Sequence, residues 1–239
     1  MMKCFIKQLG TMKVVDPDYG DLKLTVMPFI HSKGIELPTA FRIWQQQVTD
    51  LLELIPIQLQ AQQHYITIDS KYFTEDDYLR REGLHIDGNF CYDPNFSYAT
   101  WGGTTWAGTC IEDGEVITKF KSPFDIKIPL GAYVSESKGG LITVSSFGGC
   151  EGYAGIMPSH VGNEGAYSDE HIKHLEPVLF EANEINFMSS NTPHRTLMIP
   201  QGTRRTLLRI TLDCNYDNSA LTAGTHIPEN TEGKLWSHL

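Results

Sequence analysis

Short segments in which apolar residues occupy every second position are the feature that most restricts the fold of this chain. Residues 22–26, 65–69 and 208–212 have this period of two, and turn-forming residues stand between such segments. A period of two is typical of a strand that buries one of its faces. The chain has 239 residues, of which 41% are hydrophobic, and this is enough for one large domain. We therefore predict an all-β core.

One segment has a helical pattern instead. Between Pro38 and about Gln63, apolar side chains follow the spacing of a single buried helical stripe. Pro38 suits the first turn of such a helix, because a missing N–H group costs nothing there, and Pro56 should kink or split it. We expect the helix to cover the outside of a sheet, and a surface that binds a partner is the alternative. The stripe consists of Phe41, Trp44, Val48, Leu51, Leu52 and Ile55.

We expect residues 1–239 to form a single domain with three parts. Residues 1–64 are predicted to be a cover of helix and strand, residues 65–213 the strand-rich core, and residues 214–239 a polar extension. A glycine-rich stretch at residues 147–165 is too long for a simple turn, and loops of this length are usually functional or disordered. We interpret this stretch as a loop that covers the substrate, and a disordered excursion is the alternative.

Charge and composition argue against several classes of function. The formal net charge is -10, and no cluster of Lys and Arg is longer than a pair, so duplex nucleic acid is not an expected partner. No apolar run approaches the roughly 18 residues of a membrane-spanning helix, and the N-terminus lacks the apolar stretch of a secretory signal. Five widely spaced cysteines without a CxxC pair are typical of thiols in a reducing compartment. We therefore expect a cytoplasmic protein without a membrane partner, and nothing in the sequence indicates its oligomeric state.

Two histidines and one carboxylate form a candidate metal site. His85 and Asp87 are two residues apart, so on a strand their side chains point to the same face, while Leu84 and Ile86 point to the other. His194 can supply a third ligand if the fold brings the two segments together. Two His and one carboxylate that leave coordination positions open are diagnostic of non-haem Fe(II) oxygenases. The alternative is a hydrogen-bonded surface pair together with a packed core histidine.

Arginines follow His194 on a predicted strand, residues 204–212. If the apolar residues of its second half lie under the helix, Arg205, Arg209 and Thr211 share the opposite, inner face. Arg204 would face inward only if the even-numbered residues of the strand formed its inner face, or if a bulge shifted the alternation. A guanidinium binds a carboxylate with two parallel hydrogen bonds, so an inward arginine suits the far carboxylate of an acid such as 2-oxoglutarate. A surface salt bridge is the common alternative for any one of these arginines.

With these residues, the chain resembles the Fe(II)- and 2-oxoglutarate-dependent dioxygenases over roughly residues 65–213. The pattern is His85-x-Asp87, then His194, then an arginine about ten residues later. The resemblance implies a double-stranded β-helix, or jelly roll, with N-terminal helices packed on one sheet. It implies that these three residues bind Fe(II), and that 2-oxoglutarate is the cosubstrate. The identity of the substrate is not carried over from the family, and we expect hydroxylation of a small molecule or a protein side chain. The resemblance leaves open which residues hold the 5-carboxylate: the candidates are Arg204, Arg205, Arg209 and Thr211.

Two other functions remain open from the sequence. The first is a metal enzyme of the cupin type that does not use 2-oxoglutarate. Cupins usually place more His and a Glu soon after the first metal pair, and residues 88–91 contain neither. The second is a jelly roll without enzymatic activity, such as a carbohydrate-binding or structural module. Metal binding and oxo acid binding together distinguish the three functions.

Overall fold

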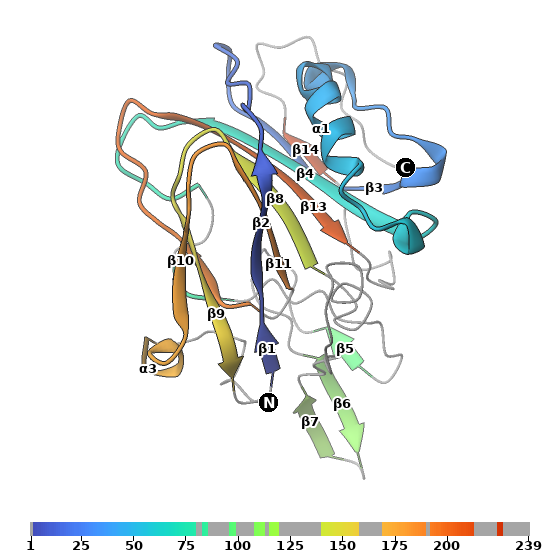
Figure 1. Ribbon diagram of the computed structural model, residues 1–239, viewed down its shortest axis with the longest axis vertical. Helices are drawn as coiled ribbons and strands as arrows, with labels where there is room; N and C mark the ends of the chain where they lie inside the picture. The colour runs from blue at the N-terminus through green and yellow to red at the C-terminus, as the bar shows by residue number, and fades with distance from the viewer. Residues whose placement is uncertain are drawn as a thin grey trace.

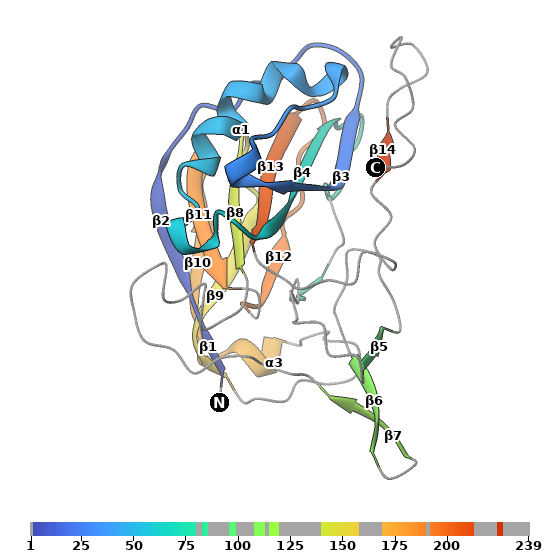
Figure 2. The same ribbon diagram turned by 90° about the vertical axis from the view of Figure 1, so that its right-hand side faces the viewer.

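The computed structural model of the protein (Figure 1) is dominated by antiparallel β-sheet in the part of the chain that it describes. Two sheets contain most of the strands, and a helical segment lies on the outer side of the larger sheet (Figure 2). This arrangement confirms the prediction of an all-β core. The structure describes residues 2–79, 83–85, 96–98, 108–112, 115–119, 140–157, 169–189, 192–212 and 224–226.

Among the described residues, the larger sheet has seven strands, and all of its neighbouring strands are antiparallel. The strand that was predicted to carry the arginines, β13, lies between β4 and β8 in this sheet. Its register places Leu208 between Ile68 and Val144, so one face of the three strands is continuously apolar. In order across the sheet, the strands are β14 (Gly224–His226), β3 (Leu22–Ile30), β4 (Gln63–Tyr72), β13 (Arg204–Leu212), β8 (Gly140–Ser145), β11 (Glu184–Ser189) and β2 (Ile6–Thr11).

The smaller sheet is built around β9 (Cys150–Met157). One side of β9 pairs with β10 (Glu176–Phe180) along residues 150–154. The start of β9 also pairs with β12 (His194–Thr196), and its end pairs with β1 (Met2–Cys4). His85 pairs with His194 of β12 and thereby adds the segment around residue 85 to this sheet.

A helical segment covers the outer face of the larger sheet, but it is shorter than predicted. The 3-10 helix η2 (Thr39–Trp44) continues into α1 (Gln45–Leu52), which ends before Pro56. After a further short 3-10 helix, η3 (Ile57–Leu59), the chain enters β4 at Gln63, so this end of the predicted helix belongs to a strand. The proline explains the early end, because it lacks the N–H group that a helix interior needs.

The main hydrophobic core lies between this helical segment and the larger sheet. Phe41, Trp44 and Val48 pack in one buried cluster with Leu208 and Ile210 of β13. The even-numbered apolar residues of β13 therefore lie under the helix, and this confirms the parity on which the inward direction of Arg205 and Arg209 was predicted. The remaining regular elements are η1 (His31–Lys33), α3 (Asp169–Ile172) and a three-stranded sheet of β5 (Phe96–Tyr98), β6 (Gly108–Glu112) and β7 (Glu115–Lys119).

The glycine-rich stretch at residues 147–165 was predicted to be a loop, and for residues 150–157 this is wrong, because they form β9. Close packing explains two of its glycines. A Cβ atom on Gly152 would lie 2.7 Å from the side chain of Ile6, and one on Gly155 would lie 2.8 Å from Leu175. Gly155 also has a φ of +141°, which side-chain-bearing residues rarely adopt. Residues 158–165 lie outside the described part.

The three predicted parts of the chain are interwoven in the sheets. Residues 1–64 contribute β1, β2 and β3 besides the helical segment, and the boundary at residue 65 falls inside β4. The extension at residues 214–239 contributes β14, which pairs with β3. Among the described residues, no helix has the length and apolar character needed to cross a membrane.

Candidate active site

The structure brings His85 and His194 together, although more than a hundred residues separate them in the sequence. The backbone N–H of His85 donates to the carbonyl oxygen of His194 at 2.9 Å, and the reverse bond measures 2.8 Å. The two imidazole ring centroids are 4.5 Å apart, with 55° between the ring planes. Two imidazoles that bind one ion hold their nitrogens within about 4 Å of each other, because each metal–nitrogen bond is about 2.0–2.1 Å. Rings this close can serve one ion.

Both imidazoles are oriented by the same local contact. His85 Nδ1 lies 2.8 Å from the carbonyl oxygen of Gly83, and His194 Nδ1 lies 3.0 Å from the carbonyl oxygen of Thr192. A carbonyl oxygen only accepts hydrogen bonds, so each Nδ1 carries the proton. In a neutral imidazole, the lone pair then sits on Nε2. A metal-binding histidine is usually held in place by a hydrogen bond that its other ring nitrogen donates to a neighbouring group.

The structure therefore places two of the three predicted ligands side by side. His85 and His194 are both buried, with 5% and 6% of their surfaces exposed, which limits competition from water. Asp87 lies outside the described residues, so the predicted third ligand stays a prediction. Within the described ranges, no group of three or more His, Cys, Asp or Glu side chains is arranged to hold a metal ion.

A pocket connects the two histidines with the inner face of the larger sheet. It has about 610 Å³ of empty space, part of which is open to solvent. Residues of β8, β9, β10, β11, β12 and β13 line it, so the pocket lies between the two sheets. Its wall combines apolar side chains such as Phe147 and Phe180 with two arginines. Small-molecule sites typically have this composition of apolar walls and a few polar groups.

Arg205 and Arg209 both line this pocket. They are 3% and 8% exposed, and buried guanidinium groups are rare unless they have partners. Arg205 Nε donates to Ser145 Oγ at 2.8 Å, which orients the guanidinium from the neighbouring strand. Arg209 lies in register between Thr143 and Thr67, both buried. The inner face of the larger sheet is thus polar where β8 and β13 meet the pocket, and β13 contributes the two arginines.

The structure separates the other two candidates from the pocket. Arg204 points to the opposite face of β13, where its guanidinium lies 3.9 Å from Asp21 and over the ring of Tyr72. Thr211 is buried and shares the inner face with Arg205 and Arg209, but it is not among the pocket-lining residues. Parity explains both positions, because successive side chains of a strand alternate between its faces.

Several polar residues of the pocket were not predicted from the sequence. Thr143 and Ser145 alternate with Ile142 and Val144 on β8, so the period of two could have predicted that these two polar side chains share one face of the strand. Cys150, Thr196, Glu181 and Glu184 also line the pocket. Their positions depend on how β9 to β12 pair, and no local pattern indicates such pairing.

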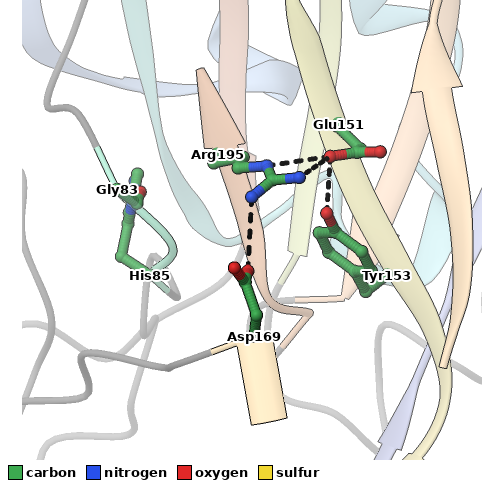
Figure 3. Close-up of polar contacts among 6 residues, drawn as sticks. All are labelled: Gly83, His85, Glu151, Tyr153, Asp169 and Arg195. Atoms are coloured by element: carbon green, nitrogen blue, oxygen red, sulfur yellow. Dashed lines mark hydrogen bonds and ion pairs between the residues drawn. The ribbon is translucent and has the colours of Figure 1, made fainter. Parts of the chain in front are cut away.

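A second polar group, the outer cluster, consists of Glu151, Tyr153, Asp169 and Arg195 (Figure 3). The guanidinium of Arg195 contacts both carboxylates, and the hydroxyl of Tyr153 donates to Glu151. Burial raises the pKa of Tyr153 to about 12, and the hydrogen bond and negative charge of Glu151 add to this shift. Tyr153 therefore keeps its proton at neutral pH. No pattern in the sequence marked this cluster.

The chain was compared with protein-family models and with curated protein sequences. No family model matches it, and no curated protein matches it in sequence.

Proposed function

We propose that the protein is an Fe(II)- and 2-oxoglutarate-dependent oxygenase that hydroxylates a small molecule or a protein side chain. One observation carries the proposal: two buried histidines, both with Nδ1 hydrogen-bonded to a carbonyl, share a pocket with two buried arginines. The histidines suit a divalent metal, and an arginine suits the carboxylate of an oxo acid.

The order of the strands supports a double-stranded β-helix. From β4 onward, the chain passes from the larger sheet to the segment of His85 in the smaller sheet and back to β8. It then adds β9 and β10 to the smaller sheet, β11 to the larger, β12 to the smaller and β13 to the larger. Strands that alternate between two facing antiparallel sheets are the basis of a jelly roll.

The residues present fit the metal that the proposal requires. His85 and His194 would bind Fe(II) through Nε2, because their Nδ1 protons are engaged by Gly83 and Thr192. Asp87 would complete the facial set of two imidazoles and one carboxylate. Three protein ligands would hold the ion and leave room beside it for the cosubstrate. Arg205 or Arg209 would bind the 5-carboxylate of 2-oxoglutarate, and Ser145 holds the guanidinium of Arg205 in place.

Bound Fe(II) would supply the chemistry by which O2 and 2-oxoglutarate convert a substrate C–H group into an alcohol, with succinate and CO2 as coproducts. The side chains of the pocket would bind and orient the cosubstrate. Phe147, Phe180 and Leu207 form part of the apolar lining and would restrict the entry of water.

Calorimetry under anaerobic conditions tests the proposal, with Mn2+ in place of iron. We expect 2-oxoglutarate to bind saturably only when Mn2+ is present, and His85→Ala and His194→Ala to abolish this binding. The matched control is His174→Ala, because this histidine is exposed and contacts the carbonyl oxygen of Ile156 outside the pocket. With Fe(II), O2 and 2-oxoglutarate, the wild-type protein should release succinate, and His85→Ala should not.

The other two functions give different results in the same titration. Metal binding without 2-oxoglutarate binding would contradict the proposal and favour a cupin-type enzyme. The absence of both would favour a jelly roll without enzymatic activity. Full succinate release by His85→Ala or Asp87→Ala would show that the metal ligands are wrongly assigned.

A further inference from the structure

The strand that carries His194 is short and lies at a critical position. β12 has three residues, and it connects β9 on one side with His85 on the other. Neighbouring side chains of a strand point to opposite faces, so His194 faces the pocket and Arg195 faces the outside of the smaller sheet. Any rotation of β12 about its axis would therefore move the two side chains together.

Arg195 is fixed by several contacts on that outer face (Figure 3). Its Nε and Nη2 lie 2.8 Å and 2.7 Å from the same carboxylate oxygen of Glu151, which also accepts a hydrogen bond from the hydroxyl of Tyr153. Its Nη1 lies 3.3 Å from Asp169 at the start of α3. The guanidinium also lies over the ring of Tyr153, 5.6 Å from the ring centroid.

These contacts hold β12 to β9 at the level of the metal site. Arg195 and Glu151 are directly opposite in the register of the two strands, and the next pair is His194 with Gly152. The side chains of Arg195 and Glu151 are 34% and 21% exposed, so water and salt screen this pair less than a fully exposed one. The glycine opposite His194 has no side chain, so the cluster supplies the side-chain contacts between the two strands at this point.

We propose that Arg195 is a positioning residue for the metal site, and that the outer cluster fixes the direction of the His194 imidazole through the backbone of β12. The inference rests on the proposed function, because it takes His194 to be a metal ligand. Two imidazoles must direct their Nε2 atoms at one ion, so a small rotation of β12 weakens binding without unfolding the sheet. Substitution of a residue that orients a metal ligand typically weakens metal binding by about 10–100-fold.

The test is a titration with Co2+ of the wild-type protein, Arg195→Ala and Arg195→Lys. We expect Arg195→Ala to weaken Co2+ binding about 10–100-fold, and to alter the visible absorption spectrum of the saturated protein because the ligand geometry changes. Arg195→Lys retains the charge, so it should recover part of the affinity. Glu151→Gln removes the negative charge that holds Arg195 and keeps nearly the same side-chain shape at position 151. This variant should also weaken Co2+ binding. The matched control is Arg42→Ala, because Arg42 forms an exposed ion pair with Glu36 away from the pocket.

A second measurement needs no metal. The 15N chemical shifts of the imidazole nitrogens report which nitrogen carries the proton, and wild-type His194 should show the proton on Nδ1. Arg195→Ala should shift the His194 signals and leave those of His64 unchanged. Unchanged Co2+ affinity, Co2+ spectrum and His194 signals in Arg195→Ala would overturn the inference while the proposed function stands. Failure of the wild-type protein to bind Co2+ would overturn the proposed function and this inference with it.

Discussion

The substitution Arg205→Met addresses the choice between the two arginines of the pocket. Arg205 is 3% exposed, lines the pocket and is anchored through Nε to Ser145 Oγ at 2.8 Å. The anchor fixes the plane of the guanidinium, and a fixed plane favours two parallel hydrogen bonds to a carboxylate. Methionine has a similar length and no charge, so the substitution removes the proposed contact while it retains much of the packing volume. We expect Arg205 to be the principal 2-oxoglutarate ligand.

The magnitude follows from the burial of the pair. Removing one partner of a buried, hydrogen-bonded charge pair costs about 2–5 kcal/mol of binding free energy. Since about 1.4 kcal/mol corresponds to a factor of ten, the Kd of 2-oxoglutarate should rise roughly 30-fold to several thousand-fold in Arg205→Met. Arg205→Lys keeps the charge and loses the planar fork, so its Kd should lie between those of the wild type and of Arg205→Met.

Anaerobic calorimetry in the presence of Mn2+ measures these changes. Arg204→Met is the comparison within the same strand, because Arg204 lies on the other face near Asp21, and its Kd should stay within about twofold of the wild type. Arg209→Met should have a smaller effect than Arg205→Met. A larger loss in Arg204→Met than in Arg205→Met would refute the reasoning from strand parity, and a larger loss in Arg209→Met would refute the argument from the Ser145 anchor.

Three further predictions concern stability. Burial lowers the pKa of His64, and the nearby His31 adds a smaller contribution, so the folded protein favours the neutral form of this ring. The contribution of His64 to stability should be complete above about pH 6.5 and decrease below that value, by at most about 1.4 kcal/mol per pH unit. Urea unfolding between pH 5 and 8 measures this, and the unfolding free energy of His64→Gln should depend less steeply on pH than that of the wild type. Gly140→Ala should destabilise the protein by about 1–3 kcal/mol in the same assay, because its Cβ would lie 2.5 Å from the ring of Phe187, whereas Gly148→Ala should have a smaller effect. Trp44→Phe removes the donor to the carbonyl oxygen of Val15 and should lower the unfolding free energy by about 1–3 kcal/mol, and an unchanged urea midpoint would contradict this role.

The parts of the fold that depend on local patterns could be predicted from the sequence. The inner direction of Arg205 and Arg209 was predicted because Leu208 and Ile210 alternate with them, and the buried core confirms that parity. The meeting of His85 with His194 was predicted from residue types, their spacing and the resemblance to a known family, and the structure brings the two together through their backbones.

The parts that depend on distant residues could not be predicted. The glycines of β9 indicated a loop, yet Gly152 and Gly155 are needed because Ile6 and Leu175 pack against them. Likewise, Glu151 and Arg195 meet only because β9 and β12 pair in one particular register. Residues that are far apart in the chain set these contacts, and a single sequence contains no local trace of them.

If His85 and His194 bind the proposed ion, their backbone pair would link metal loading to the stability of the fold. An ion bound to both side chains would act as a clamp across a chain segment of roughly a hundred residues, and such a clamp restricts the unfolded state most when the enclosed segment is long. Stability would then vary with the concentration of the ion, because ligands that bind only the folded state shift the unfolding equilibrium. A chelator such as EDTA should therefore lower the Tm of the metal-loaded protein and leave that of His85→Ala unchanged. In a cell short of iron, loss of the metal would therefore also increase the fraction of the protein that is unfolded.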